Sequence, residues 1–175
     1  MVETRKVNMA KLLIVEDSKF FSSLLVKKVE SELGIPVIAV PNMAGAKSAI
    51  AKMKDDFFLA LLDLTLPDAQ DGEIVEYIRS EKIPSVVFTG TFSEEMREDI
   101  LAKDVIDYVT KDSPSSVEYL LSLVNRIWNN RDLTAMVVDD SRTARKMIAR
   151  YLARYQFHVL EAADGKEALA LADAS

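Results

Sequence analysis

Residues 57–63 read Phe-Phe-Leu-Ala-Leu-Leu-Asp, an uninterrupted apolar run that ends abruptly on a carboxylate. A strand that is buried on both faces of a parallel sheet has this kind of continuous apolar sequence. Residues 11–17, Lys-Leu-Leu-Ile-Val-Glu-Asp, show a similar arrangement, with a short apolar run followed by two acidic side chains. The two runs predict buried strands of a parallel sheet, each ending in negative charge.

Short apolar runs alternate along the chain with amphipathic stretches of helical period. Five strands that alternate with five helices imply parallel pairing through right-handed crossovers. The predicted fold is α/β, a flavodoxin-like, doubly wound sheet of five parallel strands in the order 2-1-3-4-5, with helices on both faces. We expect strands at Lys11–Val15, Pro36–Val40, Phe58–Asp63, Ser85–Thr89 and Val105–Val109, and helices at Ser18–Leu33, Met43–Met53, Asp71–Glu81, Ser93–Ala102 and Pro114–Trp128.

The pattern starts again after a polar stretch that ends at Asp132. Leu-Ile-Val-Glu-Asp-Ser at residues 13–18 recurs as Met-Val-Val-Asp-Asp-Ser at residues 136–141, a spacing of 123 residues. We therefore expect a first domain at residues 1–130 and the N-terminal part of a second, similar domain at residues 131–175. The expected elements of that second part are a helix at Ser141–Tyr155, a strand at Phe157–Glu161 and a helix at Asp164–Asp173.

A fragment of this kind leaves one edge of its first strand bare, and it is too small to fold well by itself. Either the natural chain is longer, which is the favoured interpretation, or a second chain covers the edge.

Composition excludes several classes of protein. Apolar residues make up 49% of the 175 residues and charged residues 29%, which is typical of a globular protein. The chain has no cysteine, so disulfides and thiolate metal sites are excluded, and the net charge of −6 disfavours direct binding of nucleic acid. The apolar runs are too short to span a membrane, and residues 1–8 lack the apolar segment of a signal peptide. We therefore expect a cytoplasmic protein without a membrane partner.

Charged and hydroxyl side chains fall where the predicted strands end. Glu16 and Asp17 follow the first strand, Asp63 ends the third, Thr89 ends the fourth, and Lys111 lies just past the fifth. In a sheet of the predicted order these residues should converge in one crevice. Carboxylates at such close range repel one another, and a divalent cation relieves that repulsion. An all-oxygen site suits Mg²⁺, or Mn²⁺ in its place.

This arrangement indicates phosphoryl chemistry. Asp63 is a candidate nucleophile that forms an acyl phosphate. A metal ion held by Glu16 or Asp17 together with Asp63 would neutralise phosphoryl oxygens, Lys111 would pair with another oxygen, and the Thr89 hydroxyl would bond the last.

The chain resembles the receiver domains of bacterial response regulators, the phosphoacceptor part of two-component signalling systems. The resemblance covers about residues 9–130 as a whole domain and residues 134–175 as a partial one. The motifs that carry it are the acidic pair Glu16-Asp17, Asp63 with Pro67 four residues on, Phe88-Thr89-Gly90, and Tyr108 three residues before Lys111.

The resemblance implies that Asp63 accepts a phosphoryl group from a sensor histidine kinase or a phosphotransfer protein, and that Mg²⁺ is required. It implies a switch pair in which Thr89 moves toward the phosphoryl group and Tyr108 turns inward. It also makes the main-chain carbonyl of Thr65 a further metal ligand.

The implied protein is a switch rather than an enzyme. Its fourth helix, fifth strand and fifth helix would bind a partner or an output domain. An output such as a diguanylate cyclase belongs only to a longer chain, and a homodimer is left open.

Three features depart from the family pattern. Asp112 follows Lys111, where proline is usual, so a cis X-Pro bond is absent there. The segment 67–72 is one residue longer than the common form. In the second copy, Asp139 and Asp140 repeat the metal-binding pair, but no phosphoacceptor follows them, so that copy cannot complete the chemistry.

Other functions stay open as alternatives. One is a pseudo-receiver that binds partners without phosphorylation, which the retained Asp63, Thr89 and Lys111 argue against. A phosphohydrolase with an aspartyl nucleophile would need an acid two residues further on, where this chain has Thr65. A dinucleotide-binding enzyme is weaker still, because the five glycines do not form a Gly-x-Gly-x-x-Gly motif.

Overall fold

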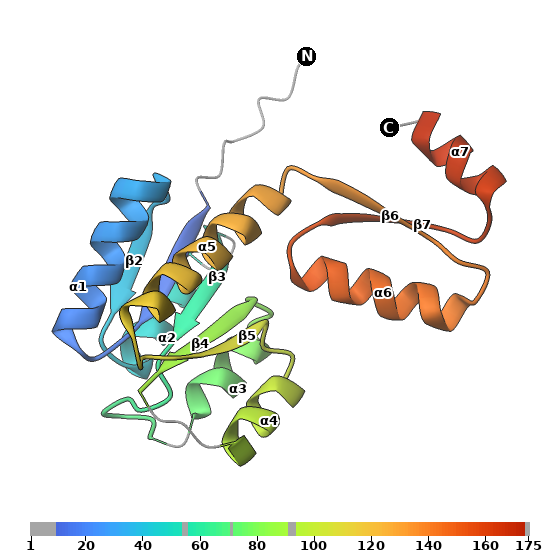
Figure 1. The fold of residues 1–175 in the computed structure, drawn as a ribbon. Coiled ribbons are helices and arrows are strands. Elements are labelled where there is room, and N and C mark those ends of the chain that lie inside the picture. Colours follow the sequence, from blue (N-terminus) through green and yellow to red (C-terminus); the bar gives the residue numbers. More distant parts are fainter. Residues whose placement is uncertain (1–9, 54–55, 71, 91–93, 174–175) are drawn as a thin grey trace. The chain divides into compact units, whose positions relative to one another are not determined.

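The computed structural model describes residues 10–53, 56–70, 72–90 and 94–173 (Figure 1). The chain forms two compact units that meet between Ser122 and Leu123. The predicted helix starts at Asp71 and Ser93 lie outside the described residues, as do residues 1–9 and 174–175. The domain boundary predicted after residue 130 stays a prediction, because one helix, α5 (Pro114–Asn130), runs through the division between the units.

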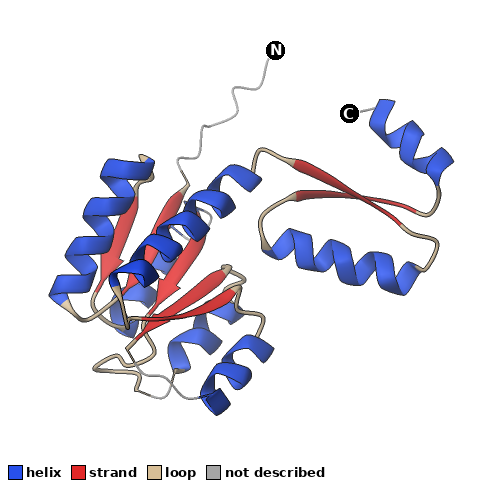
Figure 2. Ribbon diagram, in the orientation of Figure 1, coloured by secondary structure: helices blue, strands red, loops and turns tan. Residues whose placement is uncertain are grey.

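The first unit is built on a five-stranded parallel sheet, and its strand order confirms the prediction. From one edge to the other the order is β2 (Val37–Val40), β1 (Lys11–Val15), β3 (Phe57–Leu62), β4 (Ser85–Thr89) and β5 (Asp107–Thr110) (Figure 2). All six residues of β3 are buried, as its continuous apolar sequence predicts.

The side chains of the sheet alternate between two helical layers. Leu13, Val15 and Val87 belong to one core cluster with buried residues of α2 (Met43–Met53), α3 (Glu73–Ser80) and α4 (Glu94–Ala102). The opposite face is covered by α1 (Lys19–Lys28), which continues as a π-helical turn, η1 (Val29–Leu33), and by the first turns of α5 (Figure 1). The chain thus has the predicted doubly wound architecture, in which the carboxyl ends of the strands meet at one edge.

Two element boundaries differ from the prediction for identifiable reasons. Val105 and Ile106 are buried, but the paired part of β5 begins only at Asp107, opposite Val86. Their apolar character therefore reflects packing before the strand. The first helix does not stay α-helical to Leu33. It changes hydrogen-bond pattern at Val29 and ends at Gly34, whose φ of 67° favours glycine.

The second unit contains a two-stranded parallel sheet of β6 (Thr134–Val138) and β7 (His158–Ala162), with helices α6 (Arg142–Arg154) and α7 (Gly165–Asp173). These elements confirm the predicted order of strand, helix, strand and helix. Ser141 caps α6, accepting from the Ala144 N–H at 3.4 Å, as Ser18 caps α1 through the Phe21 N–H at 3.5 Å. That the unit is part of a second receiver stays a prediction.

Across the described part of the chain, we find no helix with the length and apolar character needed to cross a membrane.

Candidate functional site

Three carboxylates converge where β1 and β3 end. Val15 is paired with Leu62, and the Asp63 N–H donates to the Val15 carbonyl at 2.9 Å, so the residues that follow these strands lie side by side. Glu16, Asp17 and Asp63 each offer one carboxylate oxygen, and these atoms lie within 4.8 Å of one another. Glu16 and Asp63 are buried, whereas Asp17 is exposed.

Lys111 brings a positive charge to this cluster from beyond β5. Its Nζ lies 2.5 Å from Oε2 of Glu16 and 2.6 Å from Oδ2 of Asp63, and its side chain is only 6% exposed. The main chain holds it in place, because the Lys111 N–H donates to the Thr89 carbonyl at 2.9 Å. The ammonium group therefore balances two buried carboxylates that would otherwise be costly to bury.

The environment of Glu16 shows the balance of these effects. Burial raises its pKa above the usual value, and the hydrogen bond and the charge of Lys111 oppose that rise. The negative charge of Asp63 adds to the rise, and the Ser18 N–H, which donates to Oε1 at 3.1 Å, works against it. Burial of Glu16 thus favours its neutral form, and a nearby cation favours its charged form.

Two phenyl rings lie against Lys111. Its Nζ is 5.0 Å from the centre of the Phe21 ring and 5.4 Å from that of Phe88. The rings contact each other edge to face, with centres 5.9 Å apart and planes at 85°. Sequence reasoning assigned neither ring to the site, because no spacing rule links residues 21, 88 and 111.

The candidate switch residues lie on the neighbouring strands. Thr89 ends β4, is fully buried and is paired with Thr110 of β5. Tyr108 is 6% exposed and belongs to the core cluster on the side of α3 and α4. Burial raises the pKa of its hydroxyl, the charge of Arg97 opposes this, and that of Asp63 adds to it.

Thr65 lies against Asp63, because its N–H donates to Oδ1 of Asp63 at 3.2 Å. The role of its carbonyl as a metal ligand stays a prediction.

Asp112, which replaces the usual proline, organises the loop after Lys111. It accepts from the Thr110 hydroxyl at 2.7 Å with one oxygen and from the Ser116 hydroxyl at 2.6 Å with the other. Hydrogen bonds from Ser116, Thr110 and Ser113 lower its pKa. The carboxylate thus joins the end of β5 to the first turn of α5 across the loop that carries Lys111.

The loop after Asp63 is fastened to a helix that is distant in sequence. Leu66 and Ala69 exchange main-chain hydrogen bonds of 3.1 and 3.2 Å, which places Asp68 at the tip of a tight turn. Asp68 accepts from the N–H groups of Met43 and Ala44, both at 2.9 Å, at the start of α2. This contact lowers the pKa of Asp68 and caps α2 from outside. The sequence carried no signal for it.

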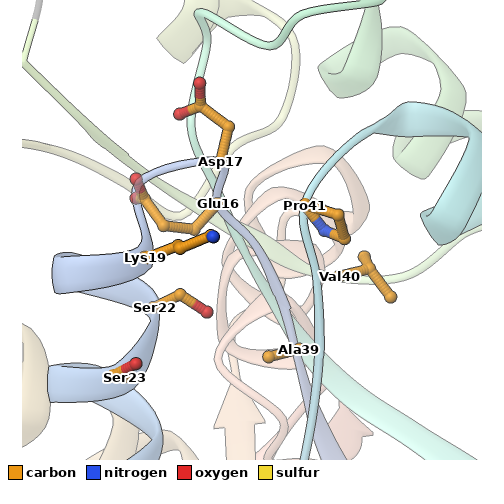
Figure 3. Close-up of a pocket in the computed structure, with 8 residues that line it drawn as sticks. All are labelled: Glu16, Asp17, Lys19, Ser22, Ser23, Ala39, Val40 and Pro41. Carbon is orange, nitrogen blue, oxygen red and sulfur yellow. The ribbon is translucent and has the colours of Figure 1, made fainter.

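A groove of about 220 Å³ opens beside the acidic pair (Figure 3). Lys19, Ser22 and Ser23 of α1 form one wall, and residues 39–41 at the end of β2 form the other. The small side chains leave the groove open next to Glu16 and Asp17.

The carboxylate cluster fits a hard divalent cation. Its three donors are all oxygens, they are close enough to share one ion, and the exposed position of Asp17 leaves room for water ligands. The Lys111 ammonium group forms ion pairs with Oε2 of Glu16 and Oδ2 of Asp63, two of the residues that would hold such an ion.

The second unit lacks this convergence within its described residues. Asp139 and Asp140 follow β6 as predicted, but the described residues contain no other group of three potential metal ligands besides Glu16, Asp17 and Asp63. Instead, Arg145 of α6 donates to the Asp139 carbonyl at 2.6 Å and pairs with Glu161 at 3.4 Å.

Comparison with known proteins identifies the family. The model of the response regulator receiver domain matches residues 12–124, more than half of the chain, and the chain therefore belongs to this family. None of the curated proteins matches it significantly.

Among solved structures, two proteins described as two-component system response regulator/GGDEF domain proteins are similar, with 38% and 37% identity and TM-scores of 0.85 and 0.83. In both cases 94% of this chain is matched, and the chain spans 66% of the length of the other protein. The Mn²⁺-bound form of a response regulator, at 23% identity and a TM-score of 0.59, shares the fold over 68% of this chain and 94% of its own.

Proposed function

We propose that the first unit is a phosphorylation switch in which Asp63 accepts a phosphoryl group with the help of Mg²⁺ or Mn²⁺. The observation that carries this proposal is the position of Asp63 between the Glu16-Asp17 pair and the Lys111 ammonium group at 2.6 Å. A buried ion pair of this kind contributes little to stability for its cost, which favours a functional reason for its presence.

The proposed reaction is an in-line transfer. A carboxylate oxygen of Asp63 attacks the phosphorus atom of a phosphohistidine, the P–N bond breaks, and the imidazole leaves as the stable product. Lys111 moves its charge from the carboxylate of Asp63 to a phosphoryl oxygen, and the Thr89 hydroxyl donates to another. Glu16, Asp17, Asp63 and the Thr65 carbonyl would hold the metal ion, which would neutralise charge on the remaining oxygens.

The response to phosphorylation is assigned to Thr89 and Tyr108. The buried position of Tyr108 supports this assignment, because it is the inward position that such a switch requires. The phosphoryl group would then stabilise that position by drawing Thr89 toward it, which shifts an existing equilibrium. The affected surface is formed by α4, β5 and α5.

The proposed donor is a sensor histidine kinase or a phosphotransfer protein, and the proposed reader of the switch is an output domain or partner at the α4–β5–α5 surface. The similarity to GGDEF domain proteins makes a diguanylate cyclase the first output to test in a longer chain. We place this activity in the cytoplasm and assign no turnover chemistry to the chain itself.

Intact-mass measurement after incubation with Mg²⁺ and acetyl phosphate tests the proposal. We expect a gain of one phosphoryl group in the native protein, no gain in Asp63→Ala, and no gain when EDTA is added. An unchanged mass in the native protein would leave a pseudo-receiver that acts by binding alone. An equal gain in Asp63→Ala would place the phosphoacceptor elsewhere.

A further inference from the structure

The two phenyl rings beside Lys111 have no part in the phosphoryl-transfer scheme above. We propose that Phe21 and Phe88 form an aromatic clamp that holds the Lys111 ammonium group in place, and that Phe21 is thereby a positioning residue for phosphoryl transfer to Asp63. This inference rests on the proposed function, because it assigns a task to Lys111 in that reaction.

The geometry is that of a paired cation–π contact. The Lys111 Nζ lies within 5.4 Å of both ring centres, and the ammonium group is almost completely removed from solvent. A cation within about 6 Å of a ring face is attracted by the ring quadrupole, and the attraction grows when water is excluded. The edge-to-face contact between Phe21 and Phe88 fixes the two rings relative to each other.

The clamp becomes important when Glu16 and Asp63 bind a metal ion or a phosphoryl group. Lys111 forms ion pairs with both of these carboxylates. Binding of a metal ion and phosphorylation of Asp63 both draw on the same oxygens, and a lysine on a flexible stem would then be free to move. The rings bind no metal and carry no phosphoryl group, so their hold on the ammonium group persists through the whole reaction.

The Phe21 ring is not required for the start of the helix. Its main-chain N–H donates to the capping Ser18, and in the second unit the corresponding N–H belongs to Ala144, which donates to Ser141 in the same way. An alanine therefore suffices for the capped turn.

Phe20 provides a matched control. It precedes Phe21 on the same turn of α1, is 69% exposed, and contacts Phe21 edge to face at 5.2 Å. The experiment compares Phe21→Leu, which keeps apolar volume but loses the ring, with Phe20→Leu and with Phe21→Tyr, which retains a ring. The first measurement is the rate of mass gain with Mg²⁺ and acetyl phosphate, a donor that needs no protein docking.

We expect Phe21→Leu to lower the rate by about thirtyfold, the factor that corresponds to one cation–π contact away from solvent. Phe20→Leu should stay within about twofold of the native rate, and Phe21→Tyr should restore it. Equal losses in the two leucine variants, or a native rate in Phe21→Leu, would overturn the proposal.

A second measurement reads the position of Lys111 without any phosphorylation. Brief acetylation of the unphosphorylated, Mg²⁺-loaded protein, followed by peptide mass spectrometry, compares the labelling of Lys111 with that of exposed lysines such as Lys19. Labelling of Lys111 should rise in Phe21→Leu and not in Phe20→Leu or Phe21→Tyr. Unchanged labelling in Phe21→Leu would refute the clamp.

The two readouts separate the two proposals. A native protein that gains no phosphoryl group refutes the proposed function, while the labelling pattern still decides whether the rings hold Lys111. Urea unfolding midpoints of all variants identify any that fail to fold, and in that case Phe21→Met replaces Phe21→Leu.

Discussion

The two units of the molecule begin in the same way and arrive at different sites. In each, a parallel strand leads to two acidic residues and a serine that caps the next helix. The main chain even makes the same contact, since the Ser18 N–H donates to Glu16 at 3.1 Å and the Ser141 N–H donates to Asp139 at 2.8 Å. The acidic pair and its turn are thus local features that do not by themselves produce a phosphoacceptor site.

The units differ in which cation reaches the acidic pair. In the first unit the cation is Lys111, which follows the edge strand β5 and contacts both Glu16 and Asp63. In the second unit the cation is Arg145 of α6, which donates to the main-chain carbonyl of Asp139. In the first unit, residues that follow β1, β3 and β5 therefore meet at one point. In the second unit, the contact with Asp139 comes from a residue only six positions further on.

The side chains beside the two acidic pairs also differ. In the first unit Ser22 and Ala39 face the groove beside the acidic pair. At the corresponding positions the second unit has Arg145 and Glu161, which form an ion pair. The same acidic turn therefore has small side chains beside it in the first unit and a charged pair beside it in the second.

Loss of one carboxylate from each acidic pair should give the largest effect. We expect Asp17→Asn to slow Mg²⁺-dependent phosphorylation by about a hundredfold, because the metal site loses a charged ligand worth several kcal/mol in the transition state. Asp140→Asn should leave the rate unchanged. The measurement is mass gain as a function of Mg²⁺ concentration. A comparable loss of rate in Asp140→Asn would mean that the second acidic pair also takes part in Mg²⁺-dependent phosphorylation. The two units would then not differ in this function.

Shortening valine to alanine at equivalent positions of β1 and β6 should give an intermediate effect. Val15 is fully buried between β2 and β3, whereas Val138 is 48% exposed. We expect Val15→Ala to destabilise the first unit by about 2 kcal/mol and Val138→Ala to cost about 0.5 kcal/mol or less. Hydrogen exchange in increasing urea, resolved by mass spectrometry, reads each unit separately. Equal costs would show that another surface covers β6 in solution.

The smallest effect is expected at Asp68, whose side chain caps α2 in the first unit. Its lowered pKa means that the folded state binds this proton less readily than the unfolded state, so the stabilisation is present above the ordinary value of 3.8 and is lost as the pH falls through the lowered value. Asp68→Asn should therefore lower the thermal unfolding midpoint at pH 7, and the difference from the native protein should vanish under acid conditions.

Asp99→Asn, a change at an exposed position of α4, serves as the control for Asp68→Asn. If the thermal unfolding midpoints of Asp68→Asn and the native protein still differ at low pH, the Asp68 side chain stabilises the fold by its shape and not by its charge.

Much of the first unit could be predicted from local pattern. The apolar run of β3 and its terminal Asp63 indicated a central strand with charge at its end, and that strand is buried along its whole length. Alternation and crossover handedness predicted a parallel sheet, and the flavodoxin-like strand order assigned to it led to the expectation that residues 16, 17, 63 and 111 would meet. The largest boundary error in the sheet, at Val105, arose because burial and strand pairing look alike in sequence.

The contacts that complete the site could not be predicted. Asp68 caps a helix that starts 25 residues earlier, and Phe21 and Phe88 meet Lys111 from two different elements. Their side chains are unremarkable in sequence, since an exposed aspartate and two phenylalanines fit many positions.

The sequence by itself determined the order and type of the elements and the edge of the sheet where charge collects, because strand burial and helix amphipathicity are properties of consecutive residues. Only the tertiary structure decided which cation faces which carboxylate, which rings lie against that cation, and which side chains lie beside each acidic pair. These outcomes depend on distances of a few ångströms between residues far apart in the chain, and electrostatic and cation–π contacts act only at such distances.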